Sequence, residues 1–165
     1  MKVIRILAIM SLSILMHSCA PLKVPTVVKN DEINEYKYMF ITQTGSLSSG
    51  VGSVYGGNYG TYGATTNKSV NPSDVIAGAL IKEGFVRLPE LKAELIDETL
   101  IVNYGESGKR NRGLGYTIEV TIQFISAKSN TLVSSCTAEG QGETEADDIR
   151  KAITRCLSSL LSEEK

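Results

Sequence analysis

Residues 116–124 read Tyr116-Thr117-Ile118-Glu119-Val120-Thr121-Ile122-Gln123-Phe124, and this stretch decides the fold. Apolar residues alternate with polar ones along its whole length, which is the pattern of a β-strand with one buried and one solvated face. A polar turn at residues 126–130 follows, so Thr131 to Glu139 is expected to return as the partner strand. The sequence therefore predicts an antiparallel hairpin as the centre of the domain.

Two helices are expected to pack on this sheet. Asn71 is a good N-cap for the first, Asp74 completes a capping box, and Gly84 supplies a left-handed stop. Thr144 and Asp147 form a capping box at the start of the second helix. Both helices carry an apolar stripe at helical spacing: Val75, Ile76, Ala79, Leu80 and Phe85 in the first, and Ile149, Ala152, Ile153, Cys156, Leu157 and Leu160 in the second.

Three further strands are predicted from short apolar runs at Tyr36–Thr42, Phe85–Leu88 and Thr99–Tyr104. The resulting order is β-α-β-β-β-β-α. It predicts an α+β fold with a mostly antiparallel sheet and both helices on one face. A long Gly/Ser/Tyr loop follows the first strand.

The amino terminus has the organisation of a secretory signal. Lys2 and Arg5 precede an apolar run that ends at Met16, and a small residue stands directly before Cys19. The run is too short for an uncleaved transmembrane anchor. We therefore expect residues 1–18 to be a signal peptide, 19–35 a tether, and 36–165 a single α+β domain.

Residues 45–66 are rich in glycine and serine, with Tyr55, Tyr59 and Tyr62 interspersed. So many glycines are costly to order, and the segment is expected to be a mobile loop. The tyrosines offer flat amphipathic faces to a partner protein or a sugar ring. The alternative is a low-complexity insertion that only joins two elements.

Two groups of charged residues are candidates for binding an ion or a charged ligand. Lys109, Arg110 and Arg112 lie in a predicted polar turn at residues 105–115, and they form either a patch for an anionic lipid or phosphate, or a solvated hairpin tip. The acidic residues at positions 143–148 are read as complementing the positive end of the second helix rather than as a cation site.

Cys136 and Cys156 are the two other cysteines of the chain. Cys136 shares the strand phase of Leu132, and Cys156 lies on the buried stripe of the last helix. They either form a disulfide between helix and sheet or remain two separate buried thiols.

Composition excludes several function classes. Removal of the signal leaves 15 basic and 18 acidic side chains, a net charge of −3 that does not favour nucleic acid. The single histidine, His17, is lost with the signal, so no imidazole is present for acid–base catalysis or metal binding. We expect no enzyme activity, no cofactor and no metal.

Met16-His17-Ser18-Cys19 resembles the lipobox of bacterial lipoproteins. The resemblance implies that Cys19 is acylated and becomes the first mature residue. The next residue, Ala20, is similar to the residue found at this position in lipoproteins sent to the outer membrane. The style of this lipobox and the Gly/Tyr loop also look like lipoproteins of the Bacteroidetes group.

The domain resembles those of envelope lipoproteins of unknown function, with a layout seen in transport-auxiliary lipoproteins and in the TolB amino-terminal domain. The residues that carry the likeness are 98–104, 118–134 and 149–161. It implies a non-enzymatic binding or assembly accessory, anchored to the outer membrane and facing the periplasm, whose partner is an envelope protein or complex. The alternative is a glycan- or lipid-binding module that uses the tyrosine-rich loop.

Overall fold

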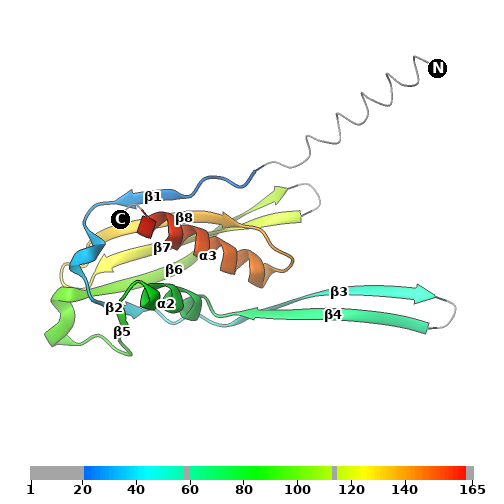
Figure 1. Ribbon diagram of the computed structural model, residues 1–165, viewed down its shortest axis with the longest axis horizontal. Helices are drawn as coiled ribbons and strands as arrows, with labels where there is room; N and C mark the ends of the chain where they lie inside the picture. The colour runs from blue at the N-terminus through cyan, green and yellow to red at the C-terminus, as the bar shows by residue number, and fades with distance from the viewer. Residues whose placement is uncertain (1–20, 58–59, 113–114, 163–165) are drawn as a thin grey trace, which may run out of the picture.

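The computed structural model describes residues 21–57, 60–112 and 115–162, with the backbone alone described at residues 50–67. A six-stranded sheet forms the body of the protein, in the order β1-β8-β7-β6-β2-β5 (Figure 1). Its strands are β1 (Thr26–Lys29), β2 (Tyr38–Ile41), β5 (Val86–Arg87), β6 (Thr99–Arg112), β7 (Gly115–Ser126) and β8 (Leu132–Gly140).

The sheet is mixed, because three of its five strand pairings are antiparallel and two are parallel. Strands β1, β8, β7 and β6 form an antiparallel series, whereas β2 runs parallel to both β6 and β5. Parallel neighbours need a crossover between them, and α2 (Pro72–Lys82) lies in the connection from β2 to β5. The predicted α+β class is confirmed, and the predicted strand order and antiparallel character are corrected.

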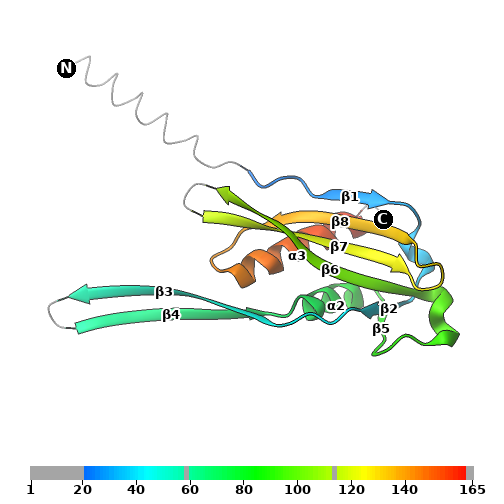
Figure 2. The same cartoon turned by 180° about the vertical axis from the view of Figure 1, so that it is seen from behind.

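Both α-helices of the described chain lie on the same face of the sheet (Figures 1 and 2). The longer one, α3 (Glu145–Ser162), packs on β7 and β8 and also contacts α2. Two short 3-10 helices, η1 (Ile33–Glu35) and η2 (Ala93–Glu98), connect strands. Within the described residues, no helix has the length and apolar character needed to cross a membrane.

The alternating pattern of the central strand is confirmed. Ile118, Val120, Ile122 and Phe124 are fully buried, whereas Gln123 between them is exposed. The predicted stripe of α3 is buried against them over all six of its positions. In α2 the buried positions include Ile76 and Leu80, whereas Val75 and Ala79 are half-buried. Phe85, the last residue of the predicted stripe, lies after the end of the helix and is also half-buried.

Residues 26–35 were expected to be part of a linker, and they belong to the domain instead. Strand β1 pairs with β8 from Thr26↔Thr137 to Lys29↔Ser134. Ile33 follows and is fully buried in the core. This short strand was missed because Val27 and Val28 are too few to give a periodic signal.

The two glycine-rich stretches form strands rather than loops. Residues 45–66, expected to be a mobile loop, contribute β3 (Leu47–Gly57) and part of β4 (Gly60–Val70). Residues 105–112, expected to be a turn, extend β6 along β7 with a register shift between Glu106 and Gly108. In both places backbone pairing with an adjacent strand outweighs the low strand propensity of glycine.

The expected helix caps are present in part. The Asn71 side chain accepts a hydrogen bond from Ser73 N at 3.2 Å, and Gly84 has a φ of 100°, as a left-handed stop requires. Asp74 is not part of a capping box, because its carboxylate binds Arg87 at 3.2 Å. Thr144 Oγ1 accepts from Asp147 N at 3.3 Å at the start of α3.

Gly140 allows α3 to lie directly against the end of β8. A Cβ atom at this position would overlap the Asp148 carbonyl oxygen and stand 2.5 Å from Ala152 N. Both atoms belong to the helix backbone, so neither can move aside without shifting α3.

We therefore predict that Gly140→Ala lowers the free energy of unfolding by about 1–3 kcal/mol, the usual cost of overpacking a core. The matched control is Gly105→Ala, another strand glycine, which has no atom within 4 Å of the added methyl group. Urea denaturation of both variants checks the difference. Equal stabilities would contradict the close packing of α3 on β8.

Candidate functional site

The most unusual element is a two-stranded hairpin that leaves the body of the domain. Strands β3 and β4 pair along eleven residues, from Leu47↔Val70 to Gly57↔Gly60, a length of roughly 37 Å. In the described part of the chain, neither strand pairs with any other strand. Figures 1 and 2 show the hairpin extending beyond the helices as a separate arm.

The base of the arm is fixed to the first turn of α3. Lys68 Nζ lies 2.6 Å from Asp147 Oδ2 and 3.0 Å from Glu143 Oε2. The hydrogen bonds to these carboxylates raise the pKa of Lys68, and the bond from Lys68 lowers the pKa of Asp147. Ser49 Oγ accepts from Ala146 N at 2.9 Å on the other strand. The arm is therefore held at both strands by one helix end.

Charged residues are absent from the arm above this base. No Asp, Glu, Lys or Arg occurs in the 30 residues from Tyr38 to Asn67, although such residues make up 21% of the chain. At that frequency about six would be expected. Tyr55 and Tyr62 stand opposite each other in the β3–β4 register, and Tyr59 lies outside the described residues. Tyr55 and Tyr62 are thus placed in the outer part of the arm.

The three basic residues of the expected anion patch all have partners within the chain. Lys109 Nζ lies 2.8 Å from Glu145 Oε1 and 5.2 Å from the centre of the Tyr116 ring. Arg110 binds Glu139, and Arg112 donates a hydrogen bond to Gln141. Their charged groups are directed at neighbouring side chains of the same chain.

The buried carboxylate of Glu139 binds groups from two other parts of the chain, near the start of the described residues. Glu139 has a side chain only 2% exposed, and Arg110 binds both of its oxygens, at 2.8 and 2.7 Å. The Arg110 guanidinium lowers the pKa of Glu139 to about 2. This group stays ionised at neutral pH and serves as a fixed acceptor.

The same carboxylate holds the amino-terminal segment. Lys23 N donates to Glu139 Oε2 at 3.0 Å, and Arg155 Nη2 donates to the Lys23 carbonyl oxygen at 2.8 Å. Cys19, the expected acylation site, lies outside the described residues. Because four residues span at most about 14 Å, the segment between Cys19 and the clamped Lys23 is much shorter than the tether expected over residues 19–35. Sequence patterns gave no signal for this clamp.

Cys136 on β8 and Cys156 on α3 are brought together. Both residues are buried, their sulfur atoms are in contact, and their Cα atoms lie 5.5 Å apart, a separation typical of disulfides. We propose that the two cysteines form a disulfide that joins the helix to the sheet.

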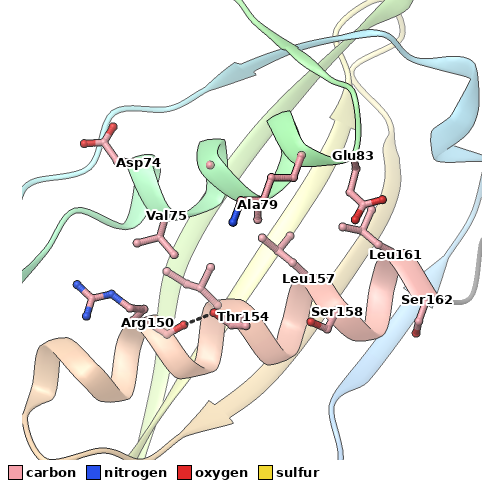
Figure 3. A pocket seen from close by; sticks show the side chains of 13 residues that line it. Asp74, Val75, Ala79, Glu83, Arg150, Thr154, Leu157, Ser158, Leu161 and Ser162 are labelled. Atoms are coloured by element: carbon pink, nitrogen blue, oxygen red, sulfur yellow. Dashed lines mark hydrogen bonds between the residues drawn. The ribbon is translucent and has the colours of Figure 1, made fainter.

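A shallow groove runs between α2 and α3 (Figure 3). Its volume is about 610 Å³, and its floor includes Val75, Ala79, Leu157 and Leu161. Charged side chains such as Asp74 and Arg150 stand at its rim. The lining contains neither histidine nor cysteine, and Asp74 is paired with Arg87. The groove therefore offers mainly apolar contact.

The acidic residues at the start of α3 also have structural partners. Glu143 and Asp147 bind Lys68, Glu145 binds Lys109, and Asp148 accepts a hydrogen bond from Gly142 N. Burial raises the pKa of Asp148. Among the residues described, no group of His, Cys, Asp and Glu is arranged to hold a metal ion.

No protein-family model and no curated protein matches the chain. Solved structures of the PelC dodecamer from Paraburkholderia phytofirmans are similar in layout. A PelC variant shares 15% identity, covers 81% of this chain and 95% of its own, and has a TM-score of 0.45. A second PelC structure shares 13% identity over 84% and 98% of the two chains, with a TM-score of 0.47. Nothing about function follows from likeness at this level.

We predict that the purified mature chain is about 2 Da lighter without reductant than with it, because the disulfide lacks two thiol hydrogens. Closing a loop with a sequence separation of 20 residues corresponds to about 3 kcal/mol of stability, so reductant should lower the unfolding midpoint. The Cys136→Ala/Cys156→Ala variant is the control and should not respond to reductant. Unchanged mass on reduction would show two free thiols.

Proposed function

We propose that this chain is a lipid-anchored, non-enzymatic accessory protein of the bacterial cell envelope, and that the β3–β4 arm is its binding element. The observation that carries the proposal is the combination of an arm that leaves the domain, a base fixed to α3, and a strand pair without charges above that base.

The anchor in this proposal is an acylated Cys19. The clamp at Lys23 then keeps the domain close to the membrane surface, because so little chain separates the two residues. Ala20, directly after the acylated residue, supports an outer-membrane location, and we place the domain on the periplasmic side. Several acyl chains would make attachment effectively permanent.

The arm is suited to binding because covering it with a partner would remove no charged side chain above its base from water. Removing charged side chains from water costs several kcal/mol unless each is paired, and the 30-residue stretch contains none. Tyr55 and Tyr62 would add amphipathic contact area at little cost in side-chain entropy. The attachment to α3 limits the directions in which the arm can point, which reduces the entropy lost on binding.

Absence of catalysis is part of the proposal. The only histidine of the chain is His17, within the expected signal peptide. The acidic residues at the start of α3 are used in ion pairs and backbone contacts. A glycan- or lipid-binding role is the second candidate, favoured by the facing positions of Tyr55 and Tyr62.

We predict that a photoreactive amino acid at position 55 or 62, incorporated in intact cells, captures the same envelope protein from both positions, a further copy of this chain included. The control is the same probe at Tyr116, an exposed tyrosine of β7 outside the arm. Mass spectrometry identifies the captured protein. Capture of glycan alone would favour the second candidate, and equal capture from position 116 would contradict a role for the arm.

A further inference from the structure

The arm exposes two open sheet edges that lack the usual protection. Natural edge strands are guarded by charged side chains, prolines or bulges. Neither β3 nor β4 contains a proline, the only charged residue in the two strands is Lys68 at the base, and their pairing runs through eleven residues without a register shift. In the sheet of the body, by contrast, the β6–β7 and β7–β8 ladders both contain a shift.

A hairpin with two unpaired edges lacks the neighbouring strands that normally stabilise a β-sheet. Two-stranded sheets without a third strand or a packed helix are marginally stable in water. Here α3 supports only the base, through Lys68 and Ser49. Among the described strands none continues the sheet beyond either edge. A strand from outside the described residues would complete the arm.

We infer that the missing strands come from further copies of this chain, with β3 of one copy pairing with β4 of the next. This inference rests on the proposed function, because it identifies the partner of the arm. A second copy presents an edge of the same length and the same lack of charge. The contact joins two different surfaces, so it can repeat from copy to copy.

The start of the described chain favours this arrangement over a two-fold one. The arm leaves the body on the side where the described chain begins, and it extends beyond that point (Figures 1 and 2). Copies anchored through Cys19 and clamped at Lys23 would all stand in one orientation, with their arms parallel. The outer edges of adjacent arms then belong to β3 and β4, which run in opposite directions, as antiparallel pairing requires.

Crosslinking of the acylated protein in vesicles of phosphatidylethanolamine and phosphatidylglycerol, with no other protein present, tests the inference. Variants with a single added cysteine, Ser53→Cys in β3 and Ala64→Cys in β4, are combined, because these positions stand level in the hairpin register. Tyr62→Cys and Thr66→Cys lie two residues to either side of position 64 on β4, so they would detect pairing between copies in a register shifted by two residues. Cys136 and Cys156 are buried and do not interfere.

The expected result is a crosslinked dimer in the β3/β4 mixture, at a yield at least tenfold above that of either variant alone. A proline blocks an edge by removing its N–H group. Of two consecutive strand residues, one directs its N–H outward and the other toward the hairpin partner, so Val51→Pro and Gly52→Pro are both tested. One should abolish the product by blocking the outer edge, and the other by interrupting the pairing of β3 with β4. Val51→Ala keeps the amide and should leave the yield unchanged. Circular dichroism verifies that the body remains folded.

Other outcomes would overturn the inference. Crosslinking of Ser53→Cys with itself, without product in the mixture, would show a two-fold contact between β3 strands. Vesicle-bound protein with no crosslinked product from any pair would show that the arm meets lipid or stays unpaired. If position 55 nevertheless captures a different envelope protein in cells, the proposed function stands and only self-pairing fails. Failure of both experiments contradicts both proposals.

Discussion

The packing of α3 across β7 and β8 is the contact on which the rest of the structure depends. It buries the inward face of β7, from Ile118 to Phe124, under the apolar stripe of the helix, and the absence of a side chain at Gly140 permits the close approach. The same helix holds the arm at its first turn through Asp147 and binds the amino-terminal segment through Arg155. One helix therefore sets the position of the core, the arm and the segment around Lys23.

The body and the arm of the molecule differ in what they contribute to stability. The body has a continuous apolar core, and several of its charged side chains form ion pairs, the buried Glu139 with Arg110 among them. The arm contributes little to that core, and in the described chain its outer edges have no strand partner. A segment of this kind is easily changed without loss of the fold. Its uncharged sequence is in keeping with the proposal that the arm serves binding rather than the stability of the monomer.

The sequence predicted the elements whose side chains alternate or repeat strongly. The strand at residues 116–124 and the last helix, with its stripe from Ile149 to Leu160, were both found, because burial imposes a period on their side chains. Elements held by backbone pairing were missed. Strand β1 has only Val27 and Val28 as apolar residues, and the β3–β4 arm consists largely of glycine, serine and threonine. The clamp at Lys23 was also missed, since its partners Glu139 and Arg155 are more than 100 residues away.

Hydrogen exchange of the acylated protein in membranes is the most direct test of the claim that the arm is completed by strands from outside the chain. Amides of β3 and β4 that point away from their hairpin partner are open to water in an isolated arm and hydrogen-bonded in a completed sheet. The account predicts that nearly all amides of both strands exchange slowly in membranes, and that about half of them exchange fast when the protein is dispersed as monomers in detergent. Fast exchange of the same amides under both conditions would show that the arm has no strand partner, and would contradict the account.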